Sequence, residues 1–269
     1  MASQSFLHRA RRRHPHHRTP IPAPKTSQFL ISTQPDLAPQ EFARLIKARL
    51  QYLIRDQHPS AFARNYGFRS VGSSKRQVVE EYIGRQLGHH SYDLAIAQSD
   101  FHRFQIDDPS SDLSKPRHTT HSAYWYNLHL ALVNDMRWRE CREERLQVIH
   151  DTIMKICRLR DYSLSKAGIL PDHIHLAVGC GSEKSPADVA LCFMNNIGYA
   201  LGMDAVFQSG FFAGTFGEYD LQVIYGKKEA RKEGRKEGRG EGRKEGRKEG
   251  REEGREEGRE EERDGERVM

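Results

Sequence analysis

The chain has 269 residues and a formal net charge of +6, and its length alone suggests about two domains. It has no uninterrupted apolar run of about 18 residues, so we expect no transmembrane segment. Its four cysteines include no Cys-x-x-Cys pair, which argues against a zinc knuckle.

Residues 1–40 are predicted to form a disordered basic arm. Their first part, residues 1–26, holds six arginines and lysines, four histidines and no acidic residue, a composition that does not support a packed core. Such an arm attracts phosphate groups through counterion release. A solvated tail without a function explains the composition equally well.

Residues 41–106 form the next predicted segment. The apolar spacing predicts a helix over 41–57, and Pro59 follows its end. A short strand is expected over 66–71.

A second helix is predicted over 75–87, with Ser74 and Gln77 as a possible capping box. Tyr82 and Gln86 are four residues apart, so a helix presents both on one face. A phenol beside a metal-binding carboxamide is a specific chemical arrangement. A cation bound there can favour the phenolate and polarise a phosphate at the same time.

Residues 107–120 are rich in Asp, Ser, Pro and Thr and are predicted to be a linker. Residues 121–226 then alternate between strand and helix patterns. The expected elements are strands over 124–133, 163–170 and 173–178, and helices over 145–159 and 189–201. Strands mixed with helices in this way predict an α+β fold in which helices cover one face of a sheet.

His173 and His175 alternate with apolar residues in the last of these strands. Positions i and i+2 of a strand point to the same face, so both imidazoles project together. Two imidazoles on a rigid strand can supply two nitrogen ligands to one divalent metal ion.

Residues 227–269 repeat a Lys/Arg-Glu-Gly-Arg pattern with sixteen bases and fifteen acids. The recurring glycines weaken a helix, and there is no apolar stripe to bury. We interpret this segment as a low-complexity charged tail that is disordered or partly helical.

Two patterns together resemble a known family. His173-Ile174-His175 on a strand, with Tyr82-Ile83-x-x-Gln86 on a helix, is similar to the single-tyrosine HUH transposases, which include insertion-sequence and REP-associated tyrosine transposases. The flanking runs Leu170 to Leu176 and Arg64 to Gly72 resemble the same family. The resemblance implies a ferredoxin-like antiparallel sheet of the HUH endonuclease type.

The resemblance also implies a role for each matching residue. His173, His175 and Gln86 would hold Mg²⁺ or Mn²⁺. Tyr82 would attack a DNA phosphate and become joined to the 5′ side of the break. The implied partner is single-stranded DNA that forms a hairpin, and family members are homodimers in which one subunit's histidines work with the other's tyrosine.

The order of the segments differs from that of the family, in which the histidine strand precedes the tyrosine helix. The chain is therefore either circularly permuted or a decayed tandem of two copies. In the tandem interpretation the second copy's tyrosine would be Tyr225, but the residue four positions later is Glu229 rather than glutamine. Tyr82 is the preferred nucleophile and Tyr225 the alternative.

The leading functional hypothesis is a transposase-type enzyme that cleaves and rejoins single-stranded DNA in the cytoplasm, associated with the nucleoid. The alternative is a decayed or domesticated transposase that only binds nucleic acid. A replication initiator or relaxase with the same chemistry is a third interpretation, although those proteins tend to be larger. Basic residues of the tyrosine segment are the candidate DNA contacts: Arg64, Arg69, Lys75, Arg76 and Arg85.

Overall fold

The computed structural model describes residues 27–89 and 101–222. Residues 1–26 of the predicted disordered arm, the charged tail and Tyr225 lie outside these described residues. The arm was predicted to extend to residue 40, but Pro39 and Gln40 begin a helix, so its predicted end is wrong. Up to Glu218, the described residues belong to one compact unit.

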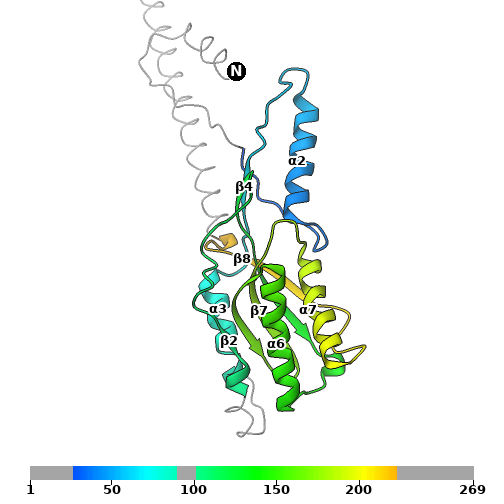
Figure 1. The fold of residues 1–269 in the computed structure, drawn as a ribbon. Coiled ribbons are helices and arrows are strands. Elements are labelled where there is room, and N and C mark those ends of the chain that lie inside the picture. Colours follow the sequence, from blue (N-terminus) through cyan, green and yellow to red (C-terminus); the bar gives the residue numbers. More distant parts are fainter. Residues whose placement is uncertain (1–26, 90–100, 223–269) are drawn as a thin grey trace, which may run out of the picture. The chain divides into compact units, whose positions relative to one another are not determined.

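A five-stranded antiparallel sheet forms the centre of this unit (Figure 1). Its strand order is β2-β6-β7-β5-β8. The strands span Ile106–Asp107 (β2), Ser163–Ile169 (β6), His173–Gly179 (β7), Asn127–Val133 (β5) and Phe212–Phe216 (β8). The mixture of helices with an antiparallel sheet confirms the predicted α+β class.

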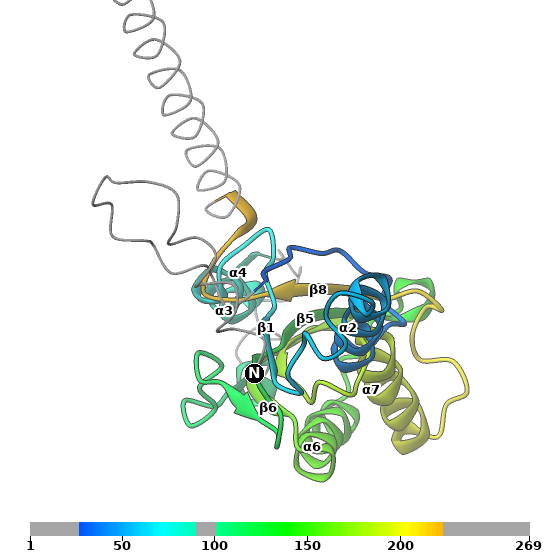
Figure 2. The same cartoon turned by 90° about the horizontal axis from the view of Figure 1, so that it is seen from above.

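Two long helices, α6 (Glu143–Arg160) and α7 (Pro186–Leu201), lie on the same side of this sheet (Figures 1 and 2). The start of α7 is the one that its sequence predicts. The Ser185 side chain accepts a hydrogen bond from the backbone N–H of Asp188, whose carboxylate accepts one from the N–H of Ser185. This capping box satisfies two backbone donors that the helix itself leaves unpaired.

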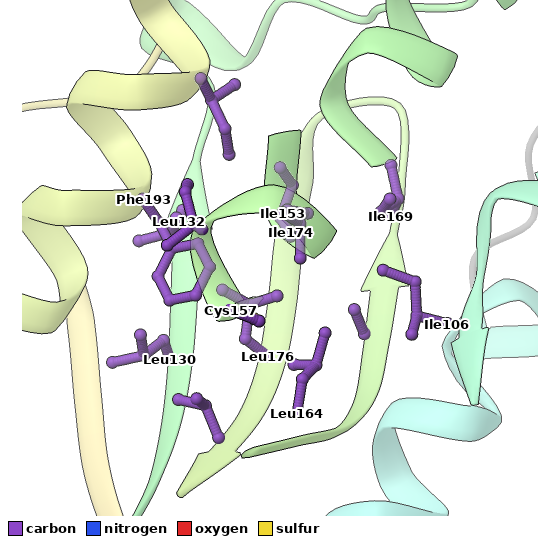
Figure 3. Close-up of a cluster of buried hydrophobic side chains, with 14 of the residues drawn as sticks. Ile106, Leu130, Leu132, Ile153, Cys157, Leu164, Ile169, Ile174, Leu176 and Phe193 are labelled. Carbon is purple, nitrogen blue, oxygen red and sulfur yellow. The ribbon is translucent and has the colours of Figure 1, made fainter. Parts of the chain in front are cut away.

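The main hydrophobic core lies between these helices and the sheet (Figure 3). Ile153 of α6 and Phe193 of α7 are completely buried, and they pack in one cluster with Leu130, Ile174 and Leu176 of the strands. In β7 the apolar positions alternate with the histidines, so the core occupies the face opposite to both imidazoles.

The histidine face of the sheet is covered by a third helix, α3 (Arg76–Gly84), on the other side from α6 and α7 (Figure 2). Val79 and Ile83 of α3 form a second buried cluster with Ala177 of β7 and Phe216 of β8. The expectation that helices cover only one face is therefore wrong, because the tyrosine helix carries an apolar stripe of its own and buries it against the histidine face.

A separate three-stranded sheet joins the two halves of the chain. Its strands are β1 (Tyr66–Arg69), β4 (Ser122–Trp125) and β3 (Arg117–His118), in the order β1-β4-β3. β1 pairs in parallel with β4. The segment 107–120, predicted as a linker, thus contributes β3 and the end of β2, and its Leu113 is buried.

The first helix of the described residues, α2 (Pro39–Ile54), buries none of its residues. Its start is attached to the rest of the unit through the backbone, because the N–H of Gln40 donates to the carbonyl of Ser182. The described residues also contain two short 3-10 helices, η1 (His102–Phe104) and η2 (Asp135–Arg137). None of the described helices combines the length and apolar character that a membrane-spanning segment needs.

The turn between β1 and α3 crosses the end of β8 in close contact. The Ser70 hydroxyl donates to the carbonyl of Phe216 at 2.6 Å, and the N–H of Arg76 donates to the carbonyl of Gly217 at 2.7 Å. A Cβ added to Gly72 would lie only 1.9 Å from the carbonyl oxygen of Thr215. In space, therefore, the tyrosine helix begins where β8 ends, although it precedes β8 in the chain.

Candidate active site

Two imidazoles lie side by side on β7, as the alternation predicts. The ring centroids of His173 and His175 are 4.9 Å apart, and the ring planes are nearly perpendicular. Both residues are almost completely buried, with exposed fractions of 6% and 7%. They occupy the sheet face that α3 covers.

Tyr82 lies on α3 beside His175, with 5.5 Å between the ring centroids. The helix lies close to Gly168 of β6, which is opposite His175 in the register. An added Cβ there would lie 3.4 Å from the carbonyl oxygen of Ile83. Tyr82 is 46% exposed, so its ring contacts the histidine while part of the side chain still meets solvent.

Gln86 is located in a separate helical turn, α4 (Gln86–His89), and is almost completely buried at 1% exposure. The single helix predicted over 75–87 is therefore wrong in its bounds, because α3 ends at Gly84 and Arg85 separates the two helices. The predicted capping box also fails, since Lys75 is the N-cap residue and no side chain caps α3. The role of Gln86 as a metal ligand stays a prediction.

Asp172 holds the first histidine of the pair. Its carboxylate lies 2.7 Å from Nδ1 of His173, and its other oxygen accepts a hydrogen bond from Arg137 at 3.2 Å. Burial raises the pKa of Asp172, but the hydrogen bonds from His173 and Arg137 outweigh it and bring the pKa below its usual value. The carboxylate thus stays ionised and fixes the orientation of the His173 ring.

A third histidine, which the sequence analysis did not identify as a site residue, belongs to the same cluster. His129 lies on β5, and its Nε2 is 3.0 Å from Nδ1 of His175. Its ring also meets Tyr82, with 5.9 Å between centroids. Burial lowers the pKa of His129 to about 4, so this imidazole is neutral at neutral pH.

The nitrogen and oxygen donors near His173 and His175 fit a divalent metal ion in their chemistry. Imidazole nitrogens are common ligands of divalent transition metals, and metal-binding histidines usually donate their second N–H to a carboxylate or carbonyl, as His173 does to Asp172. Within residues 27–89 and 101–222, no three His, Cys, Asp or Glu side chains form a group that could hold a metal ion.

Two of the five candidate DNA contacts interact strongly within the protein. The Arg69 guanidinium lies 3.9 Å from the centre of the Trp125 ring, a cation–π contact. Arg76 pairs with Glu80 at 2.8 Å and with Glu218 at 2.6 Å. Both guanidinium groups are therefore partly occupied by contacts within the protein.

The other three basic residues lie on the surface. Arg64 and Lys75 are exposed, and Arg85 is exposed and makes a long ion pair of 3.9 Å with Glu81. An exposed pair of this kind adds little to stability, so Glu81 holds the Arg85 side chain only weakly.

Comparisons with known proteins give a weak structural likeness. No protein-family model and no curated protein matches the chain. Among solved structures, a REP-associated tyrosine transposase bound to a REP hairpin matches with a TM-score of 0.31 and 14% sequence identity. The match covers 37% of this chain and 60% of that chain, so this chain spans less than two thirds of that structure.

Proposed function

We propose that this protein is a single-stranded DNA transesterase of the transposase type, with Tyr82 as its nucleophile. The observation that carries the proposal is the contact between Tyr82 and His175, with 5.5 Å between ring centroids. These residues come from segments more than ninety positions apart in the chain. A tyrosine packed against a buried histidine pair is the arrangement that a phosphotyrosine mechanism needs.

The proposed reaction exchanges one phosphoester for another. The phenolic oxygen of Tyr82 loses its proton to water and attacks the scissile phosphorus, forming the bond that joins the 5′ phosphate to the protein. The bond from phosphorus to the 3′ oxygen breaks, and that oxygen takes up a proton to become a free 3′-OH. No net phosphoester bond is lost, so the strand can be rejoined by the reverse step.

The residues beneath Tyr82 have separate tasks in this proposal. His173, His175 and Gln86 would hold Mg²⁺ or Mn²⁺, which when bound polarises the phosphate oxygens and stabilises their developing charge. Asp172 keeps the His173 ring oriented through its 2.7 Å contact. Burial of both histidines restricts water around the reacting phosphate, which strengthens electrostatic interactions there.

The path of the chain supports an HUH-type, ferredoxin-like assignment. The elements β5-α6-β6-β7-α7-β8 follow one another, and their strands lie in the order β6-β7-β5-β8. Two helical crossovers on one antiparallel sheet are the split βαβ arrangement of ferredoxin-like proteins. We include this assignment in the proposal.

The proposed substrate is single-stranded DNA that forms a hairpin, contacted by the exposed basic residues Arg64, Lys75 and Arg85. Phosphate contacts of this kind give affinity that falls as salt rises. A homodimer remains part of the proposal, but the Tyr82–His175 contact lies within one chain. A monomer would therefore suffice to bring these two groups together.

The test is a covalent-adduct assay on a denaturing gel. The purified full chain is incubated with Mn²⁺ and labelled single-stranded DNA from the flanks of its own gene. The proposal expects a shifted band that needs Mn²⁺ and is lost in Tyr82→Phe. Tyr199→Phe is the matched control, because Tyr199 lies on α7 and is 90% exposed.

The other outcomes separate the alternatives. An adduct that survives in Tyr82→Phe but is lost in Tyr225→Phe would show that Tyr225 is the nucleophile instead. DNA binding without any adduct, measured by fluorescence anisotropy on the same oligonucleotides, would favour the decayed binding protein.

A further inference from the structure

The third histidine of the site, His129, occupies a position set by the strand pairing of the sheet. β5 and β7 are antiparallel, with Ala131 opposite His175 and His129 opposite Ala177. Positions 129 and 131 share a face of β5, so His129 is the diagonal neighbour of His175 on the histidine face. The contact between the two rings, 3.0 Å from Nε2 of His129 to Nδ1 of His175, therefore follows from the register.

A hydrogen bond between two neutral imidazoles needs one donor nitrogen and one acceptor nitrogen. If His175 binds a metal through Nε2, its proton must sit on Nδ1, because a coordinating nitrogen has no proton. His175 is then the donor and Nε2 of His129 the acceptor. His173 follows the same pattern, with Nδ1 directed to the carboxylate of Asp172.

We propose that His129 is a positioning residue, which accepts a hydrogen bond from Nδ1–H of His175 and thereby fixes Nε2 of His175 as the metal-binding nitrogen. This inference rests on the proposed function, since it assigns a partner to one of the proposed metal ligands. The structure thus gives each histidine of the pair its own acceptor, a carboxylate for His173 and an imidazole for His175.

The surroundings of His129 hold its ring in place. Phe212 of β8 meets it edge to face, with 5.5 Å between centroids, and Tyr82 meets it at 5.9 Å. The same contacts offer a simpler role, in which the imidazole only fills the space between two aromatic rings. An experiment has to distinguish the effect of the hydrogen-bond acceptor on His129 from the effect of the ring's volume.

Two substitutions make this separation. His129→Phe keeps a ring of similar size but removes the acceptor, whereas His129→Gln presents a carboxamide oxygen close to the position of Nε2. The first readout is histidine ¹⁵N NMR of the full-length, metal-free chain, with the His175 signals assigned by their loss in His175→Gln. It reports which nitrogen carries the proton without requiring DNA or activity.

The inference expects His175 protonated on Nδ1 in the wild type and in His129→Gln, but mainly on Nε2 in His129→Phe. The second readout is Mn²⁺ affinity by titration calorimetry. We expect about 10–100-fold weaker binding in His129→Phe, the usual effect of losing a residue that orients a ligand, and recovery of most of the affinity in His129→Gln.

A wild-type His175 protonated on Nε2 would overturn the inference, and so would a tautomer and Mn²⁺ affinity unchanged in His129→Phe. If that variant does not fold, His129→Leu replaces it, and the wild-type tautomer still decides. The expected tautomers combined with no covalent adduct would support the role of His129 while contradicting the proposed catalysis.

Discussion

Replacing Gly72 by alanine tests how the tyrosine segment is attached to the sheet. The added Cβ would lie 1.9 Å from the carbonyl oxygen of Thr215, 3.0 Å from its carbonyl carbon and 3.1 Å from Cα of Phe216. All three are backbone atoms of β8 or its end, so no side chain can rotate to make room. The turn before α3 and the end of β8 must separate by more than an ångström.

Overpacking a well-packed site costs about 1–3 kcal/mol, and the backbone clash puts Gly72→Ala near the upper value, about 3 kcal/mol. For a folded part of this size, each kcal/mol lowers the melting temperature by about 2–4 °C. We therefore expect a melting temperature about 6–12 °C lower, measured by circular dichroism on the full-length protein.

Gly210→Ala is the matched control, because an added Cβ at Gly210 meets nothing within 4 Å. Alanine restricts the unfolded chain more than glycine does, so this control should be unchanged or up to about 1 kcal/mol more stable. If Gly72→Ala melted at the temperature of Gly210→Ala, the close crossing of these two segments would be refuted.

Three further predictions concern stability. Ser70→Ala removes the buried hydroxyl that donates to Phe216, and urea unfolding should show a loss of about 1–3 kcal/mol. Ser185→Ala removes the α7 capping box and should cost about 1 kcal/mol in the same assay. Burial raises the pKa of Glu140, but hydrogen bonds from Arg142 outweigh it and lower the pKa overall. The stability that the Glu140 carboxylate contributes is thus present above its unfolded pKa and is lost as the pH falls through its folded pKa. The loss of unfolding free energy caused by Glu140→Gln should therefore be largest at about pH 6 and smaller below about pH 4.

Each of these has its own control. Ser110→Ala removes an exposed hydroxyl that donates to the nearby Asp108 carboxylate, and it should leave the unfolding midpoint nearly unchanged. Ser185→Asp should recover much of the stability that Ser185→Ala loses, because aspartate also caps helices well. A cost of Glu140→Gln that stays constant from neutral to acid pH would contradict the assignment of a lowered pKa.

The features that the sequence predicted well are those with local causes. The alternation around His173 and His175 identifies the strand and the shared face of both imidazoles. The apolar spacing identifies the long helices, and the residues that start α7 form the capping box that they predict.

The features that were missed depend on contacts between distant segments. The parallel pairing of β1 with β4 cannot be inferred from either strand alone. The contact of His129 with His175 depends on the β5–β7 register, which a strand pattern does not specify. The break at Arg85 interrupts a run with continuous helical spacing, and the only local signal was Gly84 beside it.

The crossing of Ser70 over the end of β8 has a consequence for the order in which the molecule folds. Ser70 and Phe216 are 146 positions apart, and α3 has nine residues, of which two are buried. A helix this short is not stable alone in water. During synthesis from the N-terminus, the Ser70 hydrogen bond and the packing of α3 against Phe216 can therefore form only after β8 has left the ribosome. A product that ends before Phe216 would lack these contacts, so its tyrosine helix would be held less firmly on the histidine face.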